Sequence, residues 1–320
     1  MNFVARINLK TNTPYRDELI DFCLKGEQQY LAIGWSRIYG EGEVLTYSEF
    51  YERLRQEPGR LNTVLNIFKD THEDNLFWTR DLDGNYWICR AKGEVLTRCD
   101  KRLDVGALLP IDAYNFGMQV PGQIKAAFNR ANAGTAQKIY DAIIVEYSKA
   151  IYNKLSQTNH YDVARLEGSL LDNLPDFDLE ELVISYIQVN YDYYVLSNSI
   201  ASKSTTIKVE CEFLSRDPKR VRKAVVQVKG RKAEALDALQ FADFTQNGYE
   251  VFLFAPEVLN ADKMDNIVVI TPSELINFYE NYKAILPDSI TQWENLYYSS
   301  LLLEWKNWLC NVEALNTTSE

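Results

Sequence analysis

The most informative stretch of the chain is IKVECEF at residues 207–213, which is followed, after a basic segment, by AVVQVKG at residues 224–230. Read as β-strands, both stretches place successive side chains on opposite faces. Glu210 and Glu212 then share one face of the first strand. The basic segment between the strands contains Pro218, as an exposed hairpin loop would, so an antiparallel strand pair is predicted.

The second strand carries two polar side chains on one face. Gln227 and Lys229 point the same way as Val225, on a strand that is otherwise apolar. A buried strand rarely carries a lysine without a partner. Because an antiparallel pair brings the polar faces of the two strands together, the sequence predicts a candidate site across them.

Length and composition favour a protein of two domains. The chain has 320 residues and 46% hydrophobic content, enough for one large core or two ordinary ones. The first part of the chain consists of short strand-like and turn-like pieces and ends near the polar stretch SQTNHYD. We therefore expect domains at residues 1–158 and 159–320. Helical and strand patterns occur in both halves, and the expected fold class is α/β in the broad sense that includes α+β.

Cysteine, histidine and apolar patterns exclude several classes of protein. Five scattered cysteines without CxxC spacing indicate neither a disulfide framework nor a zinc site, and two histidines do not favour histidine-rich metal chemistry. No apolar run approaches the length of a membrane span, and the chain begins without an apolar signal region. A soluble, cytoplasmic protein that makes no membrane contact is expected.

The charge is acidic overall but uneven. A formal charge of -11 argues against a protein that coats nucleic acid. Residues 219–232, however, contain lysines and arginines and no acidic residue, which predicts a local phosphate-binding patch. An ordinary solvated loop is the alternative. The basic candidates for nucleic-acid contact around the strand pair are Lys208, Arg222, Arg231 and Lys232.

Secondary-structure patterns surround both candidate regions. In the first half, residues 74–94 form two aromatic runs around Asp83-Gly84, which predicts a hairpin with a tight turn. The second half is expected to follow the order helix, three strands, helix, strand and helix. Its expected elements include a helix at 178–190, a strand near 193–199, a helix at 232–248, a strand at 249–256 and a final strand and helix at 266–282.

The second half resembles the PD-(D/E)XK superfamily, which has the restriction-endonuclease-like fold. The similarity lies in the order of elements, the acid on one strand and the sequence Gln227-Val228-Lys229 on the next, a Gln-x-Lys version of the usual acid-x-Lys motif. The resemblance implies that Glu212, Gln227 and the Val228 carbonyl hold Mg²⁺ or Mn²⁺. It also implies that Lys229 orients the attacking water and that Glu181 is an additional acid.

Coordination chemistry is compatible with these roles. Mg²⁺ prefers oxygen ligands and keeps several waters, and a nearby lysine adds positive charge where charge develops on phosphorus. Replacing a carboxylate by Gln227 removes one negative charge and should weaken metal binding. Three alternatives stay open: Glu212 and Lys229 form a structural cross-strand ion pair, Glu210 takes the place of Glu212, and Glu181 is a simple first-turn helix acid.

The first half resembles PUA-like and EVE-like domains, small β-barrels that present an aromatic pocket to nucleic acid. The matching stretches are LAIGW at 31–35, the hairpin around Asp83-Gly84 and VPGQIKAAFNR from residue 120. The resemblance implies a reader of a flipped, modified base, with Asp81 or Asn85 recognising a base edge. The candidate stacking residues are Trp35, Trp78, Tyr86 and Trp87, and the alternative is that these aromatic side chains belong to the core.

Together the two halves predict a nucleic-acid enzyme. We expect a metal-dependent endonuclease that hydrolyses phosphodiester bonds, most simply in double-stranded DNA, with a role in restriction or phage defence. A homodimer is expected because one site cuts one strand. The main alternative is a catalytically inactive binding or signalling module with a nuclease-like fold. A third hypothesis makes the first half a small-ligand sensor that controls the second.

Overall fold

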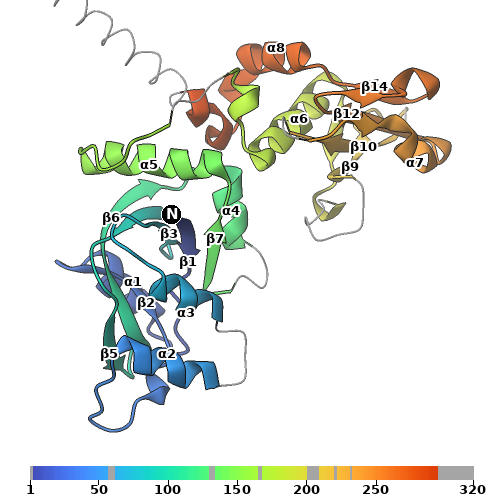
Figure 1. The fold of residues 1–320 in the computed structure, drawn as a ribbon. Helices are drawn as coiled ribbons and strands as arrows, with labels where there is room; N and C mark the ends of the chain where they lie inside the picture. Colours follow the sequence, from blue (N-terminus) through green and yellow to red (C-terminus); the bar gives the residue numbers. More distant parts are fainter. Residues whose placement is uncertain are drawn as a thin grey trace, which may run out of the picture. The chain divides into compact units, whose positions relative to one another are not determined.

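The computed structural model describes residues 3–56, 62–129, 134–164, 168–199, 209–219, 222–230 and 233–294. The chain divides into two compact units, an N-terminal unit at 1–164 and a C-terminal unit at 165–320. Each unit combines helices with a mixed β-sheet (Figure 1), which confirms the expected α/β class.

The unit boundary falls after residue 164 rather than after residue 158. The side chain of Asn153 accepts a hydrogen bond from the N–H of Tyr161 and donates one to its carbonyl oxygen, at 3.1 and 2.8 Å. The N–H of Ala164 donates to a carboxylate oxygen of Glu146 at 2.6 Å. These bonds hold the polar segment against the helix that precedes it.

The N-terminal unit is built on a curled sheet with the strand order β2-β6-β4-β3-β1-β7, in which β5 also pairs with β6 (Figure 1). Only β1 and β3 run parallel among these pairs, and the others are antiparallel. The strands are β1 (Val4–Ile7), β2 (Gln29–Ile33), β3 (Leu76–Arg80), β4 (Tyr86–Ala91), β5 (Leu96–Asp100), β6 (Val105–Gly117) and β7 (Ala136–Ile139). The helices are α1 (Arg16–Leu24), α2 (Tyr47–Gln56), α3 (Asn62–Lys69), α4 (Gly122–Asn129) and α5 (Ala142–Ser156).

The predicted hairpin is confirmed as β3 and β4. Thr79 lies opposite Trp87 in this pair, and Arg80 lies opposite Tyr86. Gly84 has a φ of +88°, the left-handed region that a glycine occupies without steric cost. The Asp-Gly dipeptide therefore fixes the turn, and the turn fixes the register of the aromatic side chains.

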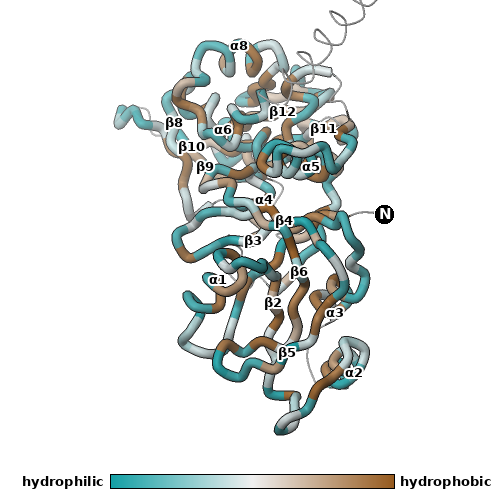
Figure 2. The backbone as a smooth tube through the Cα atoms, turned by 90° about the vertical axis from the view of Figure 1, so that its left-hand side faces the viewer, coloured by the Kyte–Doolittle hydropathy of each residue, from teal (hydrophilic) through white to brown (hydrophobic). Residues whose placement is uncertain are grey.

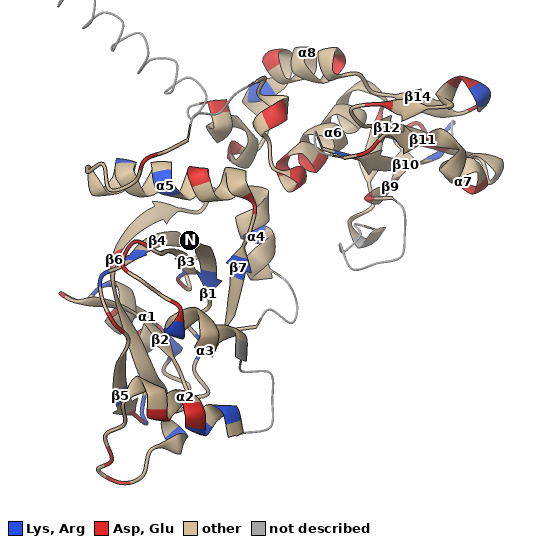
Figure 3. Cartoon of the chain, in the orientation of Figure 1, with Lys and Arg blue, Asp and Glu red and all other residues tan. Residues whose placement is uncertain are grey.

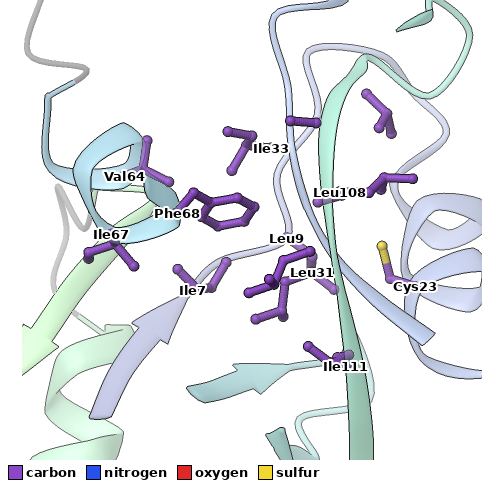
Figure 4. Close-up of a cluster of buried hydrophobic side chains, with 14 of the residues drawn as sticks. Ile7, Leu9, Cys23, Leu31, Ile33, Val64, Ile67, Phe68, Leu108 and Ile111 are labelled. Carbon is purple, nitrogen blue, oxygen red and sulfur yellow. The ribbon is translucent and has the colours of Figure 1, made fainter. Parts of the chain in front are cut away.

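A large apolar core lies between this sheet and its helices. In Figure 4, side chains from β1, β2 and α3 lie together on one side of β6 and Cys23 of α1 lies on its other side, and Figure 2 shows hydrophobic stretches along β2 and β6. The core includes the fully buried Ile7, Leu9, Cys23, Leu31, Ile33, Leu65, Phe68 and Leu109. Burial of apolar area on this scale is the main force that stabilises the unit.

The C-terminal unit contains a five-stranded sheet with the order β14-β12-β10-β9-β8. Strands β8, β9 and β10 form an antiparallel meander, and β12 and β14 continue the sheet in parallel with β10. Its elements are α6 (Asp176–Asn190), β8 (Tyr193–Val195), β9 (Cys211–Ser215), β10 (Lys223–Val228), α7 (Ala242–Gln246), β12 (Tyr249–Phe254), β14 (Ile267–Val269) and α8 (Pro272–Tyr282). A short parallel pair, β11 (Leu236–Asp237) and β13 (Val258–Leu259), lies beside it.

Two helices of the C-terminal unit follow the sequence prediction and one does not. Helix α6 covers the expected 178–190, and α8 begins with a capping box formed by Thr271 and Glu274. The long helix expected at 232–248 is reduced to a single turn, η4 (Ala238–Phe241), and the short α7. Leu236 and Asp237 pair as a strand instead, and the Asp237 side chain then caps η4 at the N–H of Leu239.

A glycine in β6 provides a test of the N-terminal unit. A Cβ atom on Gly106 would collide with the carbonyl oxygen of Gly34 and would lie 2.5 Å from the ring of Phe50. We therefore expect Gly106→Ala to lower the free energy of unfolding by about 3 kcal/mol, the upper range for overpacking, because the backbone of Gly34 cannot yield easily. Urea denaturation measures this change. Gly93→Ala is the matched control, because no heavy atom lies within 4 Å of its Cβ position; equal effects of both substitutions would contradict the packing.

Candidate functional site

The predicted antiparallel pair is confirmed as β9 and β10, and the structure shows which of the two glutamates lies beside Gln227. Glu212 lies opposite Val225, and the N–H of Glu210 donates to the carbonyl oxygen of Val226 at 2.8 Å. The paired residues begin with Cys211 opposite Val226, so Glu210 directly precedes β9 and lies beside the end of β10 that carries Gln227.

Glu210 and Gln227 are joined by a short hydrogen bond. The Gln227 amide nitrogen donates to Glu210 Oε1 at 2.6 Å and to the carbonyl oxygen of Val228 at 3.1 Å. Gln227 is 5% exposed, so this amide is held in place by packing as well. Glu212 lies two positions further along β9, roughly 7 Å away along the strand. The structure therefore brings Gln227 together with Glu210, the alternative acid, and not with Glu212.

Lys229 directly follows β10. Its N–H donates to the carbonyl oxygen of Phe254 at 2.7 Å, which continues the pairing with β12, and its side chain is exposed. Lys229 is four positions beyond Val225, the residue opposite Glu212, which amounts to roughly 13 Å along the strand. A direct ion pair between Glu212 and Lys229 does not fit this register. Lys229 is instead near the end of the pair where Glu210 and Gln227 meet.

Helix α6 carries several acidic side chains (Figure 3). Their negative charges act on the end of the strand pair where Glu210 and Gln227 meet. The pKa of the buried Cys211 thiol is raised to about 12, first by burial and then by the negative charges of Glu210, Glu181, Glu180 and Glu212. Glu181, the acid expected from the helix, therefore acts electrostatically on the first residue of β9. Its side chain is exposed, and the helix-acid alternative stays open.

An acid that the sequence did not single out lies next to the Gln-x-Lys segment. A Cβ atom on Gly230 would be 2.9 Å from Asp176 Oδ1, so the first residue of α6 contacts the residue that follows Lys229. Asp176 resembles any acid in the first turn of a helix, which is why the sequence pattern gave no reason to choose it. Only the packing of α6 against the end of β10 distinguishes it.

The donor set at this end of the pair suits a hard cation only in part. Within the described ranges, no group of three or more His, Cys, Asp or Glu side chains is arranged to hold a metal ion. Glu210, the Gln227 amide oxygen and the Val228 carbonyl are oxygen donors of the kind that Mg²⁺ accepts alongside water. Half a turn of the Gln227 amide, which exchanges its nitrogen and oxygen, would present three oxygens at one place.

The basic loop lies at the opposite end of the strand pair. It joins the end of β9 to the start of β10, so Arg222 is roughly 20 Å along the strand from Lys229. Arg222 is 4.0 Å from Glu250, which also accepts a hydrogen bond from the Tyr193 hydroxyl at 2.7 Å. Of the expected basic contacts, Arg222 is therefore remote from the site. Lys208, Arg231 and Lys232 lie outside the described residues.

Two of the four candidate stacking residues belong to the core of the N-terminal unit. The side chain of Trp78 is fully buried; its indole N–H donates to the Ser148 hydroxyl at 2.9 Å and its ring stacks on Tyr147. Tyr86 is also buried and makes an edge contact with Phe128. A base cannot reach either ring, so the placement favours the core alternative for Trp78 and Tyr86.

The other two aromatic candidates are half-buried. Trp35 has a left-handed backbone, with φ of 69°, and packs against the large core. The indole N–H of Trp87 donates to Asp81 Oδ2 at 2.9 Å, and the N–H of Asn85 donates to Asp81 Oδ1 at 2.8 Å. Asp81 and Asn85, expected to read a base edge, instead stabilise the turn of their own hairpin.

Asp81 is a charged group held in place by its neighbours. Burial tends to raise its pKa, but hydrogen bonds from Trp87, Asn85 and the backbone outweigh burial and hold the pKa below its usual range. A carboxylate with a lowered pKa stabilises the folded state above its unfolded pKa, near 3.9, and this contribution is lost as the pH falls through the folded value.

Comparisons with known proteins give no guidance here, because no protein-family model, curated protein or solved structure matches the chain. None of the helices in the described part combines the length and the apolar character needed to cross a bilayer. The function therefore has to be inferred from the geometry and chemistry of the site.

Asp81, in the turn of the β3–β4 hairpin, gives a prediction about how the free energy of unfolding depends on pH. Asp81→Asn should lower the free energy of unfolding at neutral pH by about 1–3 kcal/mol, because charge-assisted hydrogen bonds to a buried carboxylate are lost. The difference from the original protein should shrink as the pH falls from about 4, where the carboxylate of the unfolded chain is protonated, through the lower pKa that Asp81 has in the folded state. Urea unfolding over a pH series measures it. Asp83→Asn, at the exposed tip of the same turn, is the control, and a difference independent of pH would refute the role of the charge.

Proposed function

We propose that the C-terminal unit is a metal-dependent nuclease that hydrolyses phosphodiester bonds with Mg²⁺ or Mn²⁺. The observation that carries the proposal is the hydrogen-bonded group of Glu210, Gln227 and the Val228 carbonyl, with Lys229 next in the chain. The order of helix, three antiparallel strands, helix and parallel strand around it supports the resemblance to the PD-(D/E)XK superfamily.

Each residue has a defined part in this proposal. Glu210 and Gln227 would hold the cation, with the Val228 carbonyl as a further ligand. The bound cation would supply a water of lowered pKa and neutralise charge on the phosphate. The Lys229 ammonium would orient that water and stabilise the charge that develops at phosphorus. Asp176 and Glu181 lie on the helix beside the group, and we assign them at most to the shell of waters around the cation.

Gln227 supplies a neutral amide where the usual motif has a carboxylate, and this difference determines how tightly the site is expected to bind a cation. Glu210 would be the only charged ligand among the three, so the site should bind a divalent cation weakly. In the structure Gln227 donates a hydrogen bond to Glu210, and a cation must displace that bond before it can bind. We therefore expect the enzyme to require high concentrations of Mg²⁺, or to prefer Mn²⁺.

Double-stranded DNA is the proposed substrate, cut by a homodimer in restriction or phage defence. This part of the proposal follows from the family resemblance. A modified-base reader in the N-terminal unit would have to use Trp35 and Trp87, since Trp78 and Tyr86 are buried.

The alternative of an inactive binding module is favoured by one specific observation. The hydrogen bond between Gln227 and Glu210 satisfies both groups without a cation, which a structural role would also require. Such a module would bind nucleic acid equally well with Mg²⁺ or with EDTA.

Plasmid cleavage tests the nuclease. We expect cutting of plasmid DNA in Mg²⁺ or Mn²⁺, with a comparison of unmodified and cytosine-modified DNA revealing any reader function. Lys229→Ala should lower the cleavage rate by about a hundredfold or more, because it removes positive charge from the transition state. Glu210→Ala should abolish cutting, whereas Glu212→Ala should retain most of it.

Arg222→Ala is the control, because Arg222 lies at the far end of the strand pair. Cleavage that survives Lys229→Ala and Glu210→Ala would contradict the assignment of these two residues to the nuclease site. Absence of cleavage on every substrate, with DNA binding retained in EDTA, would establish the binding module instead.

Metal affinity tests the role of the amide separately. Gln227→Glu should tighten Mn²⁺ binding by about tenfold or more, because a second carboxylate replaces a neutral ligand. Without metal, the two carboxylates should repel each other and lower the thermal stability, and saturating Mn²⁺ should restore it. Calorimetric titration and thermal unfolding measure both effects. Gln188→Glu, on α6, is the control substitution; a Gln227→Glu protein that binds Mn²⁺ no better than the control would exclude the cation site.

A further inference from the structure

A mostly apolar pocket in the C-terminal unit lies against one face of α8, and its volume is about 210 Å³. Ile276, Tyr279 and Glu280 line it from α8; because they are three and four positions apart, they share one face of the helix. Leu170 and Leu171, which precede α6, line it as well. A cavity of about 150 Å³ holds one benzene ring, so this pocket has room for an aromatic side chain.

The pocket exposes apolar surface that could be covered. Ile276 is 39% exposed, whereas Leu275, next to it in α8, is fully buried. Removing apolar surface from water is the main favourable contribution to folding. A side chain that filled the pocket and covered Ile276 would therefore stabilise the C-terminal unit.

Glu294, the last described residue of the chain, is also part of the lining. Its Oε1 lies 2.8 Å from the Lys283 ammonium, and its Oε2 accepts a hydrogen bond from the Tyr279 hydroxyl at 3.5 Å. These two contacts hold Glu294 against α8 and the turn that follows it. Residues 295–320 lie outside the described ranges, and they leave the C-terminal unit from the edge of the pocket.

The sequence that continues from Glu294 suits an apolar pocket with an acidic edge. Residues 295–302 read NLYYSSLL and contain no charged side chain. Tyr297 and Tyr298 are three and four positions after Glu294, so a helix continued from it would place them on the same face. A tyrosine has an apolar ring and a hydroxyl that donates a hydrogen bond, and the exposed carboxylate of Glu280 is an acceptor at the pocket.

Trp293 anchors the start of this segment in the C-terminal unit. Its side chain is 1% exposed, and the indole N–H donates to Asp178 Oδ2 of α6 at 3.1 Å. Ile290, one turn earlier, is fully buried. A segment tethered a few residues from its binding site has an effective concentration of about millimolar or more, which favours the segment of the same chain over that of a second copy.

We propose that residues 295–302 of the same chain dock onto this pocket, and that the ring of Tyr297 or Tyr298 inserts beside Ile276. The hydroxyl of the inserted tyrosine would donate to Glu280, and the leucines of the segment would cover apolar surface around the pocket. The docking does not rest on nuclease activity, because none of these side chains belongs to the candidate site on β9 and β10.

Hydrogen exchange of the full-length protein, followed by mass spectrometry, tests the docking. We expect the backbone amides of residues 295–302 to exchange about tenfold or more slowly than those of an unstructured chain, because a docked segment opens rarely. Ile276→Glu should remove this protection, because it places a second carboxylate in the pocket beside Glu280. Ile285→Glu is the matched control: Ile285 is 66% exposed and lies outside the lining, so the protection should remain.

Substitutions within the segment test which of its side chains dock. Replacing both Tyr297 and Tyr298 by serine should raise the exchange rate of residues 295–302 as much as Ile276→Glu does, because no aromatic ring is left to fill the pocket. Replacing both Trp305 and Trp308 by serine is the control, since it removes two aromatic rings that lie further along the sequence. The exchange of residues 295–302 should then stay slow.

A cross-link shows whose segment fills the pocket. Ile276→Cys and Tyr298→Cys are combined in a protein whose Cys99 and Cys310 are replaced by serine, and the two new thiols are oxidised with diamide. We expect a disulfide within one chain, seen as a monomer on a non-reducing gel. Ile285→Cys with Tyr298→Cys should form little disulfide, because Ile285 lies outside the lining.

Three results would overturn the proposal. Residues 295–302 could exchange as fast as an unstructured chain, Ile276→Glu could behave like Ile285→Glu, or the disulfide could join two chains, which would assign the pocket to the segment of a second copy. Circular dichroism checks that each variant is folded. If Ile276→Glu disturbs folding, the cross-link decides, because it introduces no charge into the pocket.

Discussion

The pairing of β9 with β10, with Cys211 opposite Val226 and Glu212 opposite Val225, is the constraint on which the candidate site depends. A shift of one residue would move every side chain of a strand to the other face. Apolar burial makes such a shift costly: Val225 is packed in the core on one face of β10 and Val226 on the other. The packing of the valines therefore decides that Gln227 meets Glu210.

The sequence predicted which strands carry the polar residues of this site, but it did not predict which of these residues contact each other. Strand alternation grouped Gln227 with Lys229 and Glu210 with Glu212, because the period of a strand is local, and the structure joins one residue of each group, Gln227 and Glu210, by a hydrogen bond. The choice between Glu210 and Glu212 needed the register, which depends on burial across the whole sheet. The sequence also could not reveal Asp176, because its place beside Gly230 arises only from the packing of α6.

Other differences between expectation and structure have the same origin. The hairpin at Asp83-Gly84 was predictable because a left-handed glycine and a tight turn are local requirements. The burial of Trp78 was not, since its indole is covered by Ser148 and Tyr147, which lie far away in the chain. The helix expected at 232–248 failed where Leu236 and Asp237 found a strand partner, a non-local contact that outweighed helix propensity.

Electrostatics sets a condition on phosphate binding at the site proposed for the C-terminal unit. In the C-terminal unit the acids of α6 and the strand pair create a negative field at Cys211, so a phosphodiester could approach Lys229 only after a cation had neutralised that field. That site should therefore hold a phosphate only with a divalent cation, because the sign of the charge already present determines whether an anion needs a bridge.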